Sequence, residues 1–190
     1  MSTATTTRPP INGVDVPTLL ATIDAVKEQP AAADFKFRAV NRWIGGTHSR
    51  TTVHEFFGVG QEQRHIRQYT SDADHPEVLV GGDNAPSPVE HLLHALAGCI
   101  TAGIGNIASV RGIELNEVES RLEGDIDVQG VLGLSEEVRN GFRRIRATFR
   151  IVGDASESQL RAVVEQACER SAVLDMLTNG VAVDLDVETG

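Results

Sequence analysis

The chain has 190 residues, 41% of them apolar, so it is long enough to bury the hydrophobic core of a globular domain. Its formal net charge is −10 and its longest basic cluster is the pair Arg143–Arg144, which argues against nucleic acid as a partner. The two cysteines, Cys99 and Cys168, lie far apart and form no CxxC motif, which argues against a structural disulfide or a zinc site.

The N-terminal sequence MSTATTTRPPING has no apolar run of signal-peptide length. No run elsewhere approaches the roughly 18 apolar residues that a bilayer span needs. We therefore expect a cytoplasmic protein that has no membrane partner, and no cofactor is implied.

The first expected element is a short amphipathic helix over residues 16–28, where apolar residues recur at helical spacing. It divides the chain into an N-terminal tail and helix, residues 1–34, and a main domain, residues 35–190. From Phe35 the apolar period changes to two, which predicts a strand.

Gly45–Gly46 supplies a turn to a second strand over residues 49–57, so a hairpin is expected. A third strand is predicted over residues 65–70, and the segment after it is rich in turn residues. In that segment His75 is either a polar group at the mouth of a site or an ordinary loop histidine, and Asp74 has no evident partner.

A long helix is predicted to start at Ser87, which acts as N-cap with Pro88 at the first helical position. Glu90, three residues after the cap, completes a capping box, and Gly112 marks the end of the helix. The helix carries almost no charge, so we expect it to be enclosed. Its small residues allow another helix to approach closely: Ala97, Gly98, Ala102, Gly103 and Gly105.

Alternating apolar residues predict strands over residues 118–128 and 145–151, with an acidic outer face beside a basic one. This pattern favours antiparallel neighbours with cross-strand ion pairs. Residues 130–141 form a loop longer than a plain hairpin needs.

Ser156 and Gln159 form a second capping box that opens a helix ending near Arg170. A shorter helix follows Ser171, and residues 181–187 are predicted as a last, half-buried strand. The order of helices and strands predicts an α+β fold with antiparallel sheets.

The run PSPVEHLLHALAGC, residues 86–99, precedes a buried helix, the motif RGIEL, paired strands, the motif DASESQL and a helix that contains a cysteine. In this order the chain resembles the OsmC/Ohr family, the osmotically inducible protein C and organic hydroperoxide resistance proteins, over roughly residues 35–188. The resemblance implies an OsmC-like fold, in which antiparallel sheets wrap around long central helices. It also implies an intertwined homodimer in which strands from both chains complete each sheet.

Members of the family that reduce organic hydroperoxides use two cysteines. One attacks the peroxide as thiolate and becomes a sulfenic acid, and the other resolves it to a disulfide. The resemblance places the first role on Cys99. The resolving position falls on Ser171, and Cys168, three residues earlier, is the substitute that the chain offers.

The family's peroxidases also hold the thiol with a glutamate and an arginine. The glutamate position is Val89 here. Glu90 follows it by one residue and is a candidate neighbour of the site. The arginine position falls near Leu79, in a segment without arginine.

A cysteine reacts as the thiolate, which needs a nearby cation or helix N-terminus. Cys99 lies more than two turns into its own helix, beyond the reach of that helix's dipole. We therefore expect a cation from elsewhere, from a partner chain or from one of three arginines: Arg42, Arg64 and Arg67.

The residues alone favour ordinary structural roles. The apolar neighbours expected on the same helix face, Leu92, Ala95 and Leu96, would raise the pKa of Cys99 and leave an inert thiol. For Cys168 core packing is favoured, and for Glu90 helix capping.

His91 and His94, with Cys99, invite a metal site. Their spacing on the helix favours surface or interface histidines instead.

Two hypotheses follow. The first is an enzyme that reduces a small hydrophobic hydroperoxide at Cys99, with Cys168 or an external thiol as resolver. The second is a catalytically silent dimer that binds a small hydrophobic ligand or a protein partner in an apolar crevice near Cys99.

Overall fold

The structure, a computed structural model, describes residues 10–190. These residues form two compact units, Asp15–His94 and Ala95–Gly190, the second together with the segment that ends at Val14. The long helix α2 contributes residues to both. The expected division between residues 1–34 and 35–190 stays a prediction, and residues 1–9 of that tail lie outside the described residues.

The helices are α1 (Val16–Glu28), α2 (Pro88–Val110), α3 (Val128–Val131), α4 (Glu157–Glu169) and α5 (Ala172–Asn179), with 3-10 turns η1 (Pro30–Ala33) and η2 (Glu77–Leu79). The strands are β1 (Lys36–Phe37), β2 (Val40–Gly45), β3 (His48–Gly58), β4 (Gln61–Ala73), β5 (Leu115–Asp125) and β6 (Arg144–Gly153). Helices and antiparallel sheets together confirm the α+β class.

Helix α1 has the bounds that its apolar spacing predicts. The Asp15 side chain accepts a hydrogen bond from the backbone N–H of Thr18 and caps the helix, and Pro17 stands in the first turn. None of its residues is buried, although its sequence carries apolar side chains at helical spacing.

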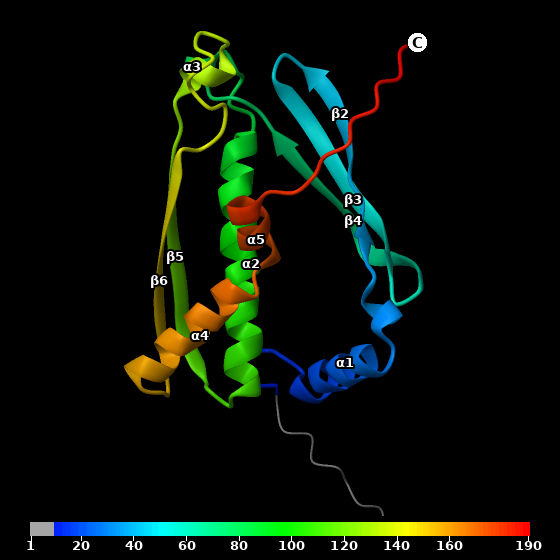
Figure 1. Cartoon of the computed structure of the whole chain (residues 1–190), viewed down its shortest axis with the longest axis vertical. Coiled ribbons are helices and arrows are strands. Elements are labelled where there is room, and N and C mark those ends of the chain that lie inside the picture. Colours follow the sequence, from blue (N-terminus) through cyan, green and yellow to red (C-terminus); the bar gives the residue numbers. More distant parts are fainter. Residues whose placement is uncertain (1–9) are drawn as a thin grey trace, which may run out of the picture. The chain divides into compact units, whose positions relative to one another are not determined.

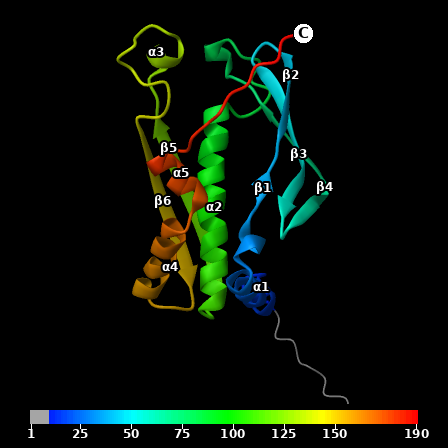
Figure 2. The ribbon, with the colours of Figure 1, turned by 45° about the vertical axis from the view of Figure 1, so that its right-hand side comes forward.

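The sheet of the Asp15–His94 unit is built around β3. Strands β1 and β2 follow one another along one edge of β3, and β4 pairs with the other edge, all antiparallel (Figures 1 and 2). The predicted hairpin over β2 and β3 is confirmed. Strand β4 is longer than the predicted 65–70, because it follows β3 on both sides of an irregularity between Val53 and Glu55.

In the second unit, the hairpin β5–β6 lies beside α2, with α4 next to both (Figures 1 and 2). Ion pairs join Arg146 to Asp125 and to Glu123, and Arg150 to Glu117. The predicted antiparallel pairing with charges across the strands is therefore confirmed.

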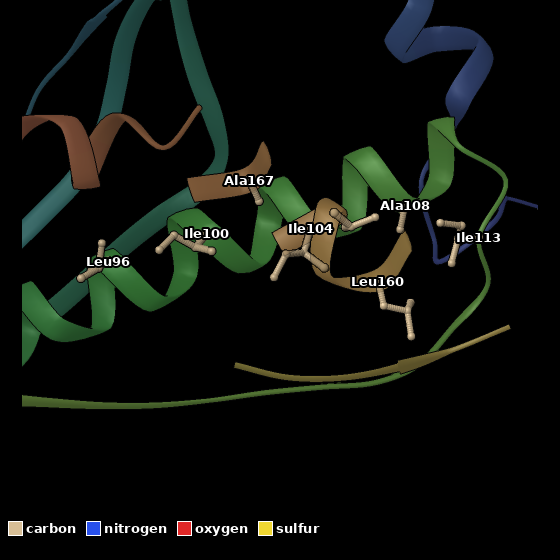
Figure 3. Packing of buried hydrophobic residues seen from close by; sticks show 8 residues of the cluster. Leu96, Ile100, Ile104, Ala108, Ile113, Leu160 and Ala167 are labelled. Atoms are coloured by element: carbon tan, nitrogen blue, oxygen red, sulfur yellow. The ribbon is translucent and has the colours of Figure 1, made fainter. Parts of the chain in front are cut away.

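The core of this unit joins the inner face of α2 to one face of α4 (Figure 3). Its buried apolar residues are Leu96, Ile100, Ile104, Ala108, Ile113, Leu160, Val163 and Ala167. A Cβ atom at Gly103 would stand 3.1 Å from the Ala167 Cβ, so this glycine lets α4 approach α2 closely.

The other face of α2 lies outside the core of its own unit. Between Ala95 and Val110 the exposed residues of this helix are uncharged and mostly small: Ala95, Gly98, Thr101, Ala102, Asn106 and Val110. The core of this unit covers one side of the helix, and the expected enclosure of the other side by another helix stays a prediction.

The C-terminal segment differs most from expectation. Residues 181–187 form no strand, and their apolar side chains are exposed. The alternation itself is present, but in the described part of the chain no strand pairs with it. Strand β5 ends at Asp125, before the predicted residue 128. It ends there because the Asp127 side chain caps the short helix α3. The last residues of α3 are the first residues of the predicted 130–141 loop.

By length and composition alone, one described helix, α2, could cross a membrane. The sequence expectation concerned an unbroken run of apolar residues, which α2 does not contain. A core helix meets the same test, and α2 carries half of the buried apolar cluster.

Candidate functional site

The Cys99 thiol meets the start of helix α5. The Ser171 hydroxyl donates a hydrogen bond to the Cys99 Sγ over 3.2 Å. Ser171 is the N-cap of α5, only 3% exposed, and its oxygen accepts the backbone N–H of Leu174. The structure thus brings together Cys99 and Ser171, which are 72 residues apart in the sequence.

Backbone N–H groups of the same helix start also reach the sulfur. Burial raises the pKa of the Cys99 thiol, but the hydroxyl of Ser171 and the N–H groups of Val173 and Ala172 lower it. The net pKa lies below the ordinary value of a cysteine, because three donors favour the thiolate. The arrangement is the general one of an anion at a helix N-terminus.

The groups that lower this pKa are hydrogen-bond donors of the same chain, and the expected cation from a partner chain stays a prediction. No charged side chain of the described residues contributes to the lower pKa. Two of the arginines considered above have other neighbours: Arg64 pairs with Glu55 at 3.2 Å, and the Arg67 guanidinium lies 5.1 Å from the centre of the Tyr69 ring. Arg42 is exposed on β2.

The helix-start donors were missed in the sequence because they are backbone groups of a distant segment. The signal that could have found them is Ser171 before the apolar run AVLDML, which marks a helix start. That this start faces Cys99 is indicated only by the family resemblance, which puts the resolving position on Ser171.

Cys168 lies in the last turn of α4, and both cysteines are free thiols. It packs against the buried cluster, and burial together with the nearby Glu165 carboxylate raises the pKa of its thiol. These surroundings hold Cys168 in the protonated form at neutral pH.

Glu90 acts at the start of α2. Its carboxylate accepts hydrogen bonds from the backbone N–H and the hydroxyl of Ser87, both over 2.7 Å. These two bonds lower the pKa of Glu90 and hold its side chain against the helix start. The bond from the Ser87 N–H to the Glu90 side chain is one of the two hydrogen bonds of the capping box that the sequence predicts.

Asp74, which has no evident partner in the sequence, is 1% exposed and organises the turn-rich segment before α2. It accepts hydrogen bonds from the Thr47 hydroxyl at 2.5 Å and the Asn84 side chain at 2.7 Å. Backbone N–H groups of His75, Gly82 and Asn84 complete the set. The hydroxyl and the amide hold the pKa of Asp74 well below its usual range. The Asx-type contacts of an aspartate in a Gly-Asn loop are the signal that could have found it.

A cavity of about 640 Å³ lies between the end of β4, the loop before α2 and the first turns of α2. Its lining includes Asp72, Glu90, His91 and His94. The His91 Nε2 donates to the Asp72 carbonyl oxygen over 2.8 Å, because a carbonyl can only accept. Within residues 10–190 no group of three or more metal-ligating side chains gathers.

Residues 81–186 match the family model described as OsmC-like protein. No curated protein matches the sequence.

Among the solved structures that are similar to the chain are three with OsmC in their names. The OsmC-like protein from Mycoplasma pneumoniae has 17% identity and a TM-score of 0.57, with 80% of this chain and 96% of that chain covered. An OsmC-like protein of unknown function from Vibrio cholerae has 12% identity and a TM-score of 0.52, with 75% and 94% covered.

An organic hydroperoxide resistance protein OsmC from Legionella pneumophila has 17% identity and a TM-score of 0.49, with 75% and 90% covered. This likeness is too low to carry an argument. The first two show the fold alone, and the family model covers more than half of the sequence. The chain therefore belongs to the OsmC-like protein family.

Proposed function

We propose that the protein reduces a small hydrophobic hydroperoxide at Cys99. The Cys99 thiolate attacks one peroxide oxygen, and the O–O bond breaks. The other oxygen leaves with its organic group and takes up a proton to become an alcohol. The sulfur is oxidised to a sulfenic acid while the peroxide is reduced by two electrons.

The observation that carries this proposal is the position of Cys99 Sγ at the N-terminus of α5, where Ser171 donates to it over 3.2 Å. A thiol in such a place ionises more easily, and the thiolate is the nucleophile. The resemblance to the peroxide-reducing members of the OsmC/Ohr family suggests a peroxide as the oxidant. For return to the thiol, Cys168 and an external thiol are the two candidates. We place the reaction in the cytoplasm, where thiols stay reduced.

The test compares the wild type with Cys99→Ser and Cys168→Ser. The rate of iodoacetamide labelling of the native protein against pH is expected to show an apparent pKa below about 8.5, the ordinary cysteine value. Cumene hydroperoxide consumption is expected to persist in C168S and to be lost in C99S. Equal consumption by the wild type and C99S would rule the proposal out.

The alternative function is a catalytically silent protein that binds an apolar molecule or a protein partner. It is favoured by Val89 and Leu79, which stand where the family's peroxidases are expected to carry the glutamate and arginine. Labelling of Cys99 only after denaturation, with no peroxide consumption, would support it.

We also propose that the chain forms an intertwined homodimer. Large apolar side chains of the Asp15–His94 sheet are exposed in the single chain, Phe37 to 75%, Trp43 to 76% and Ile66 to 96%. The segment 181–187 presents alternating apolar residues without a paired strand. Pairing with a second copy would cover surfaces of this kind and complete the strand.

A further inference from the structure

The side chain that faces the Cys99 sulfur is an alcohol. Ser171 is buried, and the Leu174 N–H donates to its oxygen over 3.2 Å. Its single O–H proton points to the sulfur over another 3.2 Å. Both contacts fix the hydroxyl in this place, so it fills the space beside the sulfur that faces α5.

A hydroxyl cannot complete the reaction that a second thiol performs. Resolution of a sulfenic acid requires a thiolate that attacks the sulfur, forms an S–S bond and releases water. A serine has no sulfur to offer, and its alcohol stays protonated at neutral pH. Ser171 can stabilise the charged sulfur by its hydrogen bond, but it cannot regenerate the thiol.

The other thiol of the chain is poorly suited to the task. Cys168 sits within α4, where its backbone carbonyl accepts the N–H groups of Arg170 and Ser171. Its side chain packs against the buried cluster. An attacking thiol must first ionise, and the apolar surroundings and the Glu165 carboxylate oppose this.

Cys99 itself is only partly buried in the single chain. We infer that Cys99 works as a single-cysteine site, in which Ser171 replaces an internal resolving thiol and a low-molecular-weight thiol from outside the chain regenerates the sulfur. This inference rests on the proposed function.

The steps balance with two external thiols for each peroxide. The first thiol attacks the Cys99 sulfenic acid, forms a mixed disulfide and releases water. The second attacks this mixed disulfide, frees the Cys99 thiol and leaves as the oxidised disulfide of the external thiol. The two electrons gained by the peroxide thus come from the external thiols.

The experiment adds cumene hydroperoxide to the whole protein with and without N-acetylcysteine. Without the thiol, consumption is expected to stop at one equivalent per chain, with a dimedone-reactive sulfenic acid on Cys99 and no internal disulfide by mass spectrometry. With the thiol, a mixed disulfide on Cys99 and continued turnover are expected. C168S is expected to behave as the wild type.

Ser171→Cys is the matched gain-of-function variant, since it puts a thiol where the hydroxyl stands. It is expected to form an internal disulfide with Cys99 after one equivalent of peroxide, whereas Ser171→Ala is not. A Cys99–Cys168 disulfide in the wild type, absent in C168S, would overturn the inference.

Failure of the proposed function looks different. In that case no variant forms a sulfenic acid, and the single-cysteine inference falls with the function on which it rests. Oxidation with diamide then still reports the geometry, because S171C would crosslink to Cys99 and the wild type would not.

Discussion

At the scale of single residues, the chemistry of Cys99 depends on donors from α5. Ser171→Ala removes the hydroxyl that donates to the sulfur, so the apparent pKa of Cys99 is expected to rise. The N-cap bond to Leu174 is lost as well, which is expected to cost about 0.5–2 kcal/mol of unfolding free energy.

The measurements are the iodoacetamide labelling rate against pH and urea unfolding. Ser135→Ala, which removes a hydroxyl in the loop after α3, is the control and is expected to leave the labelling profile unchanged. Ser171→Thr keeps the hydroxyl and is expected to restore a low pKa. An unchanged profile in S171A would show that the hydroxyl does not stabilise the thiolate.

Asp74 is the buried acid with the most partners, and its low pKa predicts a pH effect. A carboxyl whose folded pKa is below its unfolded value, about 3.9, stabilises the fold fully above that value. The contribution is lost as the pH falls below about 4 towards the folded pKa. Asp74→Asn cannot ionise, so it is expected to be less stable than the wild type at pH 7.

The measurement is the urea midpoint of both proteins at pH 7 and at acidic pH. The gap between wild type and D74N is expected to shrink in acid. Asp24→Asn, at an exposed carboxylate that forms an ion pair with Lys27, is the control. A gap that stays constant with pH would contradict the role given to the charge of Asp74.

Residue patterns alone predicted the position of Cys99 in its helix, and only the family resemblance put Ser171 near it. Helix position follows from nearby residues, whereas the contact with Ser171 joins residues 72 positions apart. The backbone donors of α5 were missed for the same reason. Every residue except proline has a backbone N–H, so the residue types do not show which of these groups will lie near the sulfur.

At the scale of elements, the core contact between α2 and α4 dominates the second unit. Ile104 has no exposed surface and lies in the buried cluster, so Ile104→Ala is expected to cost about 2–5 kcal/mol. Urea unfolding measures this as a lower midpoint with an unchanged slope.

Val110→Ala is the matched control on the same helix, because Val110 is 46% exposed. It is expected to change the unfolding free energy by no more than about 0.5 kcal/mol. Equal losses in I104A and V110A would show that the face assignment of α2 is wrong.

The helices were the best predicted elements because their ends carry local signals. Asp15, Ser87 and Ser156 start α1, α2 and α4, and each makes its capping contact within three residues. A strand needs a neighbour, which its own sequence does not supply. The alternation in residues 181–187 is therefore compatible with a strand but does not create one.

At the scale of the whole molecule, the open apolar surfaces and the unpaired C-terminal segment support a homodimer. Changing Val183 and Leu185 together to aspartate is expected to weaken association, because both side chains are exposed apolar groups of the segment that we propose to pair. Sedimentation velocity over a range of concentrations measures the change.

Asp184→Asn lies between the two and is the control, expected to leave the dimer intact. A wild type that sediments as a monomer at every concentration would remove the dimer proposal. The reactivity of Cys99 in the same samples then shows whether the thiol needs the second chain.

A single oxygen atom, Ser171 Oγ, links the sulfur of Cys99 to the first turn of α5. A group added to that sulfur is expected to displace the hydroxyl, and so to weaken the hydrogen bond that the Leu174 N–H donates to it. Protection of the Leu174 amide against deuterium exchange is therefore expected to fall when the wild type is treated with iodoacetamide. The same treatment is expected to leave this protection unchanged in C99S. A chemical change at the sulfur is therefore expected to change the stability of the first turn of α5, the helix that precedes the C-terminal segment.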